Sequence, residues 1–251
     1  MRLVVVGATG RTGGEIVAEA GERGHDVVGV ATESESVHGI QVHPAGDLPD
    51  LLDGRGGAAA DAVVDFTVPA ASREYAGVAA EAGVPYVVGT TGFDEAGVAD
   101  LRAASESVPV LKASNFARGV QALLRVVEAG VEALPDYDVE LTETHHSGKR
   151  DAPSGTANTI LDVVDDVRGE SLERTHGRRG EHLRDDAEVG VHVRRAGNVR
   201  GEHEVVLAGN DEVLTLTHRA ESRRVFAAGA VDAAGWLVGR DAGWYEFSDV
   251  L

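Results

Sequence analysis

The segment 143–156 contains the residues of this chain that are best suited to chemistry. It reads Glu-Thr-His-His-Ser-Gly-Lys-Arg-Asp-Ala-Pro-Ser-Gly-Thr and precedes an apolar run at 160–167. Histidine is the side chain whose ordinary pKa lies near neutrality, so it can give and take protons at working pH. If the Ser-Gly-Thr turn begins a helix, its free backbone N–H groups point at an anion. The combination predicts a site that binds a small, multiply negative molecule and transfers a proton to it.

The adjacent histidines, His145 and His146, would also fit a structural pair or a metal site. Isolated histidines are more often structural or surface residues, and imidazole is a common metal ligand. No third ligand at a familiar spacing accompanies this pair, whereas an anion-binding turn follows it. We therefore expect proton transfer here and no bound metal.

A glycine-rich loop near the N-terminus predicts a second ligand. Gly7, Gly10 and Gly13 lie between an apolar strand at 2–6 and an amphipathic helix at about 14–23. Glycine lets the backbone turn tightly and lie against a pyrophosphate without a clash, and the N-terminus of the helix supplies positive potential. A merely structural turn is the alternative, but the position between strand and helix favours a dinucleotide-binding loop.

The end of the next predicted strand bears on the type of dinucleotide. Glu33 stands where an acidic residue hydrogen-bonds the ribose hydroxyls of NAD, although it could also be one of 42 acidic residues on a solvated face. Ser34 stands beside it in place of an arginine that would bind a 2′-phosphate, a purpose that Arg11 could partly serve. The sequence therefore favours NADH slightly over NADPH.

Two further loops carry small polar residues after predicted strands. They read Gly-Thr-Thr-Gly at 89–92 and Ala-Ser-Asn-Phe at 113–116. Ligands bind at the carboxyl edge of open α/β sheets. We therefore expect both loops to line the nucleotide, with ordinary turns as the alternative.

The elements that must position these residues change in character halfway along the chain. Up to residue 116, predicted strands and helices alternate, as is typical of a doubly wound parallel sheet. The predicted strands are 2–6, 25–31, 62–66, 85–88 and 108–111, and the predicted helices are 14–23, 70–82 and 94–105. This half is expected to be a Rossmann-like α/β domain.

The second half predicts an α+β domain built on a mixed or antiparallel sheet. Its predicted elements are helices at 119–134 and 155–167 and strands at 137–142, 189–195, 203–208 and 212–218. Turn residues separate the last three strands, so we expect them to form an antiparallel meander. The charged stretch 168–186 is expected to be a solvated loop. A last helix at 222–237 returns to the first domain in this interpretation, which gives domains at 1–116 completed by 219–251, and at 117–218.

Composition restricts the classes of function. The formal net charge is −19, which argues against nucleic acid or an anionic membrane as a partner. Lysine is scarce, with Lys112 and Lys149 as the two in the chain, and acid-rich, lysine-poor composition favours adaptation to high salt over drift in a GC-rich genome. The absence of cysteine excludes disulfides and thiolate chemistry. No apolar run approaches a membrane span and no signal-peptide pattern begins the chain, so we expect a cytoplasmic protein.

Several motifs occur in an order that resembles a known family. They are Gly-Ala-Thr-Gly-Arg-Thr-Gly at 7–13, Asp-Phe-Thr at 65–67, Gly-Thr-Thr-Gly-Phe at 89–93, Ser-Asn-Phe at 114–116, the His-His segment at 143–156, Gly-Glu-His at 201–203 and Thr-His-Arg-Ala-x-Ser-Arg at 217–223. In this order they resemble the 4-hydroxy-tetrahydrodipicolinate reductases, also called dihydrodipicolinate reductases, of lysine and diaminopimelate biosynthesis. The resemblance covers essentially the whole chain, and the His-His segment is its most specific motif.

The resemblance implies an NADH- or NADPH-dependent reductase that transfers hydride to ring C4 of a cyclic dicarboxylic imine. Carried over by position, His145 would be the general acid/base and Lys149 a second catalytic donor. The substrate carboxylates would be held by His146, Ser154, Gly155 and Thr156. The cofactor would be lined by Gly7, Ala8, Thr9, Gly10, Arg11, Thr12, Glu33, Gly89, Thr90, Thr91, Ala113, Ser114, Asn115 and Phe116. Members of the family are usually homotetramers joined through the sheet of the second domain.

This chain departs from the family pattern in two places, and two other functions remain open. It is shorter between the second strand and Asp65, which affects the adenine end of the cofactor, and Ser147-Gly148 replaces basic or bulky residues. A sibling dehydrogenase acting on another small amino-acid-derived carboxylate is one alternative, and a non-enzymic NAD sensor is the other. A sensor would have little need of His145 and Lys149 together, and the dicarboxylate-binding turn argues for the reductase. The sequence assigns no role to Glu202, His203 or Arg223.

Overall fold

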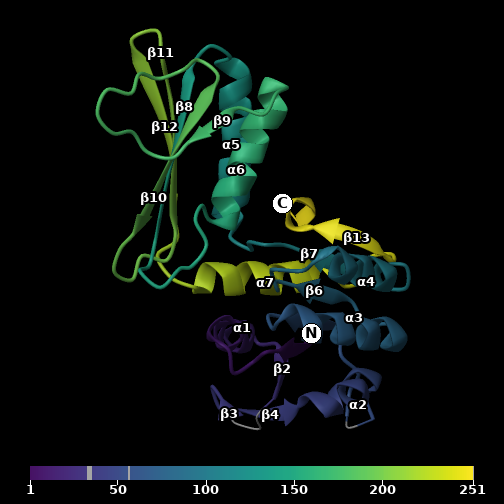
Figure 1. Cartoon of the computed structure of the whole chain (residues 1–251). Coiled ribbons are helices and arrows are strands. Elements are labelled where there is room, and N and C mark those ends of the chain that lie inside the picture. The colour runs from purple at the N-terminus through teal and green to yellow at the C-terminus, as the bar shows by residue number, and fades with distance from the viewer. Residues whose placement is uncertain (33–35, 56, 251) are drawn as a thin grey trace. The chain divides into compact units, whose positions relative to one another are not determined.

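The computed structural model describes residues 1–32, 36–55 and 57–250 (Figure 1). The chain divides into two compact units, one formed by Met1–Ala117 and Arg223–Leu251 and the other by Arg118–Ser222. The proposed NAD-binding residue Glu33 and its neighbour Ser34 lie outside the described residues.

The first unit is a largely parallel sheet with helices on both faces. Its strands are β1 (Arg2–Val6), β2 (Asp26–Ala31), β3 (Ser36–Val37), β4 (Ile40–Pro44), β5 (Ala62–Asp65), β6 (Tyr86–Val88), β7 (Pro109–Lys112) and β13 (Gly243–Glu246). Its helices are α1 (Arg11–Glu22), α2 (Leu48–Asp53), α3 (Pro69–Ala82), α4 (Glu95–Ser105) and α7 (Arg224–Leu237), with short 3-10 turns η1 (Ala45–Asp47) and η2 (Phe247–Val250). The strand order is β13-β7-β6-β5-β1-β2-β4-β3, and the pair β3–β4 is antiparallel while the others are parallel.

The strands of this sheet are buried on both faces. Along β1, Leu3 and Val5 pack in a core with α1 and α7, whereas Val4 and Val6 pack in a core with α2, α3 and α4. Such strands appear in a sequence as continuous apolar runs. This explains why the strands predicted at 2–6 and 62–66 were recognisable, and the predicted doubly wound fold is confirmed.

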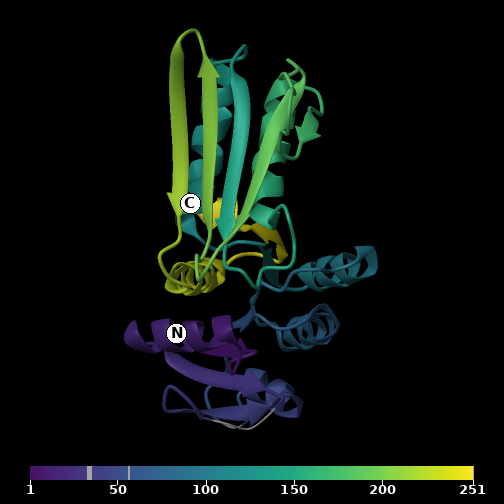
Figure 2. The same cartoon turned by 60° about the vertical axis from the view of Figure 1, so that its left-hand side comes forward.

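The second unit is a five-stranded mixed sheet with two helices against one face. Its strands are β8 (Asp138–His145), β9 (Glu173–Thr175), β10 (Glu188–Arg195), β11 (Glu202–Gly209) and β12 (Glu212–Arg219), and its helices are α5 (Arg118–Ala133) and α6 (Gly155–Arg168). Figure 2 shows the long strands side by side with the helices along one side of the sheet. Val127, Ile160, Leu141 and Val205 are members of its core, which lies between the helices and the sheet.

The predicted meander of three strands is correct for the antiparallel pair of β11 and β12 and wrong for β10, which does not pair with β11. The strand order is β12-β11-β8-β10-β9, so β8 lies between β10 and β11. β8 pairs parallel with β10 and antiparallel with β11. Helix α6 follows β8 and carries the chain back to the end of the sheet at which β8 began. Strand β10 therefore runs in the same direction as β8, and the two strands pair parallel. Apolar alternation shows which face of a strand is buried, but it does not show which strand lies beside it.

Several short elements were not predicted. β9 lies within the charged stretch that was expected to be a loop, and β4, α2 and β13 lie in regions to which the sequence assigned no element. Trp244 and Tyr245 belong to β13, which pairs parallel with β7. No helix in the described part of the chain is long and apolar enough to cross a membrane.

Helix α7 approaches the backbone of the first unit at Gly229. A Cβ atom on this residue would lie 1.8 Å from the carbonyl oxygen of Phe116 and 2.9 Å from the ring of Phe247. The Phe116 ring is itself packed between Phe66 and Phe247, with centroid separations of 5.4 and 5.2 Å. The contact therefore leaves no room for a side chain.

We expect Gly229→Ala to lower the free energy of unfolding by about 1–3 kcal/mol, because the added methyl group must displace α7 or the backbone of Phe116. Gly21→Ala in α1 is the matched control, since nothing lies within 4 Å of its Cβ position. Its higher helix propensity should raise the free energy of unfolding by about 0.5–1 kcal/mol. Urea unfolding in concentrated potassium chloride measures both changes, and changes of the same sign would contradict the steric interpretation.

Candidate active site

Glu143 on β8 is the centre of a polar cluster in the second unit. Its side chain is fully buried. It accepts hydrogen bonds from both terminal nitrogens of Arg195, at 2.7 and 2.8 Å, and from the backbone N–H of Ser154, at 3.0 Å. The Nδ1 atom of His145 lies 2.6 Å from Oε2 of this carboxylate, whereas the N–H of Ser154 binds Oε1. Because an ionised carboxylate only accepts hydrogen bonds, Nδ1 of His145 is the donor in this contact.

The ionisation of Glu143 follows from these partners. Burial by itself raises the pKa of a carboxylate, but the hydrogen bonds and charges of Arg195 and His145 outweigh burial and hold the pKa of Glu143 below its ordinary value. The carboxylate therefore stays charged at neutral pH.

The register of the sheet brings these residues together. Glu143 and His145 are two residues apart on a strand and so face the same side, which is the side that Leu141 shares with α5 and α6. The parallel pairing places Arg195 of β10 beside His145 of β8. Arg195 is far from Glu143 in sequence, and the sequence analysis did not identify it.

His145 is positioned to exchange a proton through Nε2. Burial, the largest influence, lowers its pKa; Glu143 opposes this, and the charges of Lys149 and Arg195 add to the lowering, so the pKa lies below the ordinary value. Nδ1 is bound to Glu143, which leaves Nε2 for a ligand. A Cβ atom on Gly201 would lie 3.1 Å from Nε2, so a side chain at this position would crowd the imidazole ring.

Ser154 is the N-cap of α6 and connects the anion-binding turn to the cluster. Its Oγ atom accepts a hydrogen bond from the backbone N–H of Ala157 at 3.1 Å and lies 3.0 Å from Nε2 of His203. Gly155 and Thr156 form the first turn of this 14-residue helix, whose positive end favours a carboxylate. The predicted substrate turn is thus the N-terminus of a helix.

His203 on β11 is a neutral member of the same cluster. Its side chain is 2% exposed, and its ring meets that of His145 edge to face with centroids 5.3 Å apart. Burial, reinforced by the charge of His145, lowers the pKa of His203 to about 3. Its Nδ1 atom has no hydrogen-bond partner among the described residues. His203 therefore binds Ser154 without adding charge beside His145.

The loop between β8 and α6 carries the other predicted residues of this site. Nζ of Lys149 lies 2.9 Å from Asp151, and the backbone N–H of Lys149 donates to the carbonyl of His146 at 3.1 Å. Arg195 also donates to the carbonyl of Asp151 at 2.6 Å, which ties this loop to β10. His145, Lys149 and the Ser-Gly-Thr turn are therefore gathered on one end of the second unit.

In the first unit, the predicted cofactor residues follow the carboxyl ends of parallel strands. The residues proposed at 7–12 lie in the loop after β1 and the start of α1, and those at 89–91 and 113–116 lie in the loops after β6 and β7, so all of them share one edge of the sheet. The sheet reverses its winding between β1 and β5, and this switch point is where open α/β sheets bind ligands. A Cβ atom on Gly7 would lie 2.7 Å from the carbonyl oxygen of Phe66, so the loop after β1 touches the loop after β5.

The beginning of α1 fits a pyrophosphate. Its N-cap residue is Gly10, no side chain caps it among the described residues, and its first turn contains no acidic residue. A Cβ atom on Gly13 would lie 2.0 Å from the carbonyl oxygen of Gly7. The loop after β1 can therefore pack this closely against α1 only with glycine at position 13. Free N–H groups at a positive helix end favour a phosphate group.

Three predicted cofactor residues, Ala8, Thr90 and Phe116, have buried side chains. The Phe116 ring is 1% exposed and packs in the core. The Thr90 hydroxyl accepts hydrogen bonds from the backbone N–H of Thr67 at 3.0 Å and from Ser72 at 2.8 Å. The Phe116 ring and the Thr90 hydroxyl are thus occupied within the protein, whereas Thr9, Arg11, Thr91 and Ser114 have exposed side chains.

Asp65 is a buried residue of this edge to which the sequence analysis assigned no role. Its carboxyl group accepts hydrogen bonds from the backbone N–H and hydroxyl of Thr67, at 2.9 and 2.7 Å, and from the hydroxyl of Tyr86 at 2.5 Å. Burial raises its pKa, although the surrounding hydroxyl groups oppose this. Because Thr67 also binds Thr90, Asp65 connects the loops after β5 and β6. The signal in the sequence that could have identified Asp65 is an acidic residue directly after the apolar run of a predicted strand.

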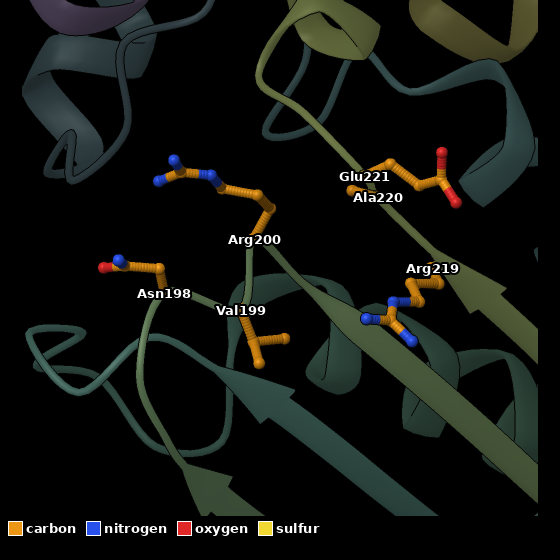
Figure 3. A pocket seen from close by; sticks show the side chains of 6 residues that line it. All are labelled: Asn198, Val199, Arg200, Arg219, Ala220 and Glu221. Atoms are coloured by element: carbon orange, nitrogen blue, oxygen red, sulfur yellow. The ribbon is translucent and has the colours of Figure 1, made fainter.

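A separate hollow of about 490 Å³ lies at the ends of β11 and β12 (Figure 3). It is lined by Asn198, Val199, Arg200, Arg219, Ala220 and Glu221. Asn198 and Arg200 extend toward the same side, and Glu221 extends away from it (Figure 3). None of the predicted catalytic residues is part of this lining. Within the described ranges, no three His, Asp or Glu side chains are grouped to hold a metal ion.

A Rossmann-like unit and a second unit in which His145 lies near the N-terminus of a helix are the two parts expected of an oxidoreductase that acts on a small carboxylate. Comparisons with known proteins agree with this class. The family model described as dihydrodipicolinate reductase, N-terminus, matches residues 1–116, and the model described as dihydrodipicolinate reductase, C-terminus, matches residues 119–251. The chain belongs to the dihydrodipicolinate reductase family.

Individual relatives are similar over their whole length. A 4-hydroxy-tetrahydrodipicolinate reductase of Natronomonas pharaonis is 74% identical over 251 residues, which is 100% of both chains. A protein of the same name from Haloarcula marismortui is 55% identical over 100% of this chain and 98% of its own. The fold is similar to that of a dipicolinate-bound dihydrodipicolinate reductase from Paenisporosarcina sp. TG-14, with a TM-score of 0.79 and 22% identity over 100% of this chain and 99% of that one.

We expect protonation of His203 to destabilise the protein in acid. Its pKa of about 3 in the folded protein lies below the ordinary value of 6.5, so the unfolded chain takes up the proton first and stability falls as the pH drops from about 6.5 toward 3. Urea unfolding across this range, at constant high salt, measures the dependence. His203→Gln can still bind Ser154 and should weaken the dependence, whereas His182→Gln, at an exposed position, should not. An unchanged dependence in His203→Gln would show that His203 is not its source.

Proposed function

We propose that this protein reduces 4-hydroxy-tetrahydrodipicolinate to tetrahydrodipicolinate with NADH or NADPH, in lysine and diaminopimelate biosynthesis. The observation that carries the proposal is the shared carboxylate of Glu143, which binds both His145 and the N-terminus of α6. One buried group thereby holds a proton donor next to a place for a substrate carboxylate. Relatives that carry this activity in their names support the choice of substrate.

The residues of the second unit have distinct roles in this proposal. The substrate carboxylates bind the turn formed by Ser154, Gly155 and Thr156, together with His146. The backbone N–H groups of Gly155 and Thr156 are the donors, because that of Ser154 donates to Glu143. A nicotinamide dinucleotide, when bound, supplies the hydride that goes to ring C4. Hydride addition to a conjugated imine leaves electron density on an adjacent atom, and His145 donates the proton from Nε2. Lys149 places a fixed positive charge beside the dianionic substrate.

The first unit supplies the cofactor site in this proposal. The glycine-rich loop and the N-terminus of α1 bind the pyrophosphate, and the loops at 89–91 and 113–116 contact the nicotinamide end. NADH is slightly favoured, because Glu33 suits ribose hydroxyls and Ser34 offers no positive charge to a 2′-phosphate. Arg11, which is exposed at the start of α1, is the residue through which NADPH would also be accepted.

We further infer a cytoplasmic homotetramer that works in concentrated salt. Helices α5 and α6 cover one face of the second sheet, while side chains on the other face of the edge strand β12 are exposed, including Val213 at 65%. A second copy of the chain packed on this face would bury them. The net charge of −19 and relatives from halophiles support the salt requirement.

The proposal is tested by NADH and NADPH oxidation in concentrated potassium chloride, with substrate made in situ from pyruvate and aspartate semialdehyde by the preceding synthase. We expect oxidation that depends on the substrate and is faster with NADH. Folded protein that binds NADH but oxidises neither cofactor would instead point to an NAD sensor or to a sibling dehydrogenase. Faster oxidation of NADPH would overturn the cofactor preference alone.

In the same assay, we expect His145→Gln to lower kcat by about 100-fold or more, because glutamine cannot donate the proton. NADH binding, followed by fluorescence titration, should stay close to that of the unchanged protein. His192→Gln is the matched control, since His192 stands on the neighbouring strand β10 and pairs with Glu140. Near-normal turnover in His145→Gln would remove His145 from the reaction.

A further inference from the structure

We propose that Glu143, held by Arg195, is a positioning residue that sets both the orientation of the proton donor and the place of the substrate carboxylate. The inference rests on the proposed function and goes beyond it, because neither residue takes part in the proton or hydride transfer of that reaction. Glu143 acts through His145 and Ser154 and does not itself touch the substrate in this proposal.

The two oxygens of Glu143 divide this task. Oε2 binds Nδ1 of His145 at 2.6 Å, and Oε1 binds the backbone N–H of Ser154 at 3.0 Å. Arg195 binds both oxygens, at 2.7 and 2.8 Å, so the carboxylate is fixed in its plane. A bidentate arginine therefore fixes the distance between the acid–base histidine and Ser154, the N-cap of the anion-binding helix.

The chemistry of a carboxylate makes this more than a packing contact. A carboxylate cannot donate a hydrogen bond, so Nδ1 of His145 must carry a proton, and Nε2 is the nitrogen that gains and loses the catalytic one. An amide in place of Glu143 would face donors on both sides. Its NH₂ group would have to displace the proton on Nδ1 of His145 or lose the contact with Ser154.

The charged groups around His145 predict the direction in which its pKa changes when Glu143 or Arg195 is replaced. Glu143 on β8 favours the protonated imidazole, while Arg195 on β10 and Lys149 in the loop after β8 oppose it. His203 on β11 faces the ring as a neutral group. Removal of the charge on Glu143 should therefore lower the pKa of His145, and removal of the charge on Arg195 should raise it.

The test compares the pH profiles of kcat for Glu143→Gln and Glu140→Gln in the substrate-dependent assay. Glu140 is a matched control because it stands on the same strand and pairs with a histidine, His192, at 2.7 Å. A reaction that needs protonated His145 loses rate as the pH rises through its pKa. In Glu143→Gln we expect this loss to begin about one pH unit lower, with kcat reduced at least about tenfold and a raised substrate KM. NADH affinity should be unchanged, and Glu140→Gln should keep the original profile.

Arg195→Gln provides an independent test, because its pH profile should shift in the opposite direction to that of Glu143→Gln. We expect its loss of rate at higher pH than in the unchanged protein. A Glu143→Gln profile that matches that of Glu140→Gln would overturn the inference, and so would an Arg195→Gln profile that moves to lower pH. If Glu143→Gln does not fold, as judged by circular dichroism and NADH binding, the direction of the Arg195→Gln shift decides. Failure of the unchanged protein to oxidise NADH with substrate would instead contradict the proposed function.

Discussion

The arrangement of the second unit depends on a charge that is buried and fully compensated. A carboxylate out of contact with water is costly unless its charge is paired and its lone pairs accept hydrogen bonds. Arg195 on β10 pairs the charge of Glu143, and Ser154 at the start of α6 and His145 on the same strand donate hydrogen bonds to it. These segments must therefore keep their register around it, and the positions of His145 and of the Ser-Gly-Thr turn follow from that requirement.

The first unit also contains a buried carboxyl group, and neutral donors satisfy its hydrogen bonds. Asp65 is buried at the end of β5, and its partners are the hydroxyl groups of Thr67 and Tyr86 and a backbone N–H. The glycine loop after β1 lies against the loop after β5, where a Cβ atom on Gly7 would clash with the carbonyl oxygen of Phe66, and against α1, where a Cβ atom on Gly13 would clash with the carbonyl oxygen of Gly7. Backbone N–H groups at the carboxyl edge of the sheet can thus approach a ligand directly, which suits a large anionic cofactor.

Elements with strong local signals were predictable, and pairings were not. The apolar run at 2–6, the glycine loop and the helix at 155–167 are local patterns, and the structure contains β1, α1 and α6 at these places. The meander was wrong for β10 because β8, more than forty residues before β10, lies between β10 and β11. Short strands such as β9 and β13 bury little apolar surface, so their sequences carry no strong periodicity.

The sequence by itself determined the fold class, the nucleotide-binding loop and the segment with His145, Lys149 and the Ser-Gly-Thr turn, because each of these depends on neighbouring residues. The tertiary structure decided that Arg195 and Glu143 form a bidentate pair, that His203 is buried and neutral, and that Asp65 connects two loops. These facts depend on strand order and on burial. Both are set by the packing of distant segments, and no local pattern in the chain encodes them.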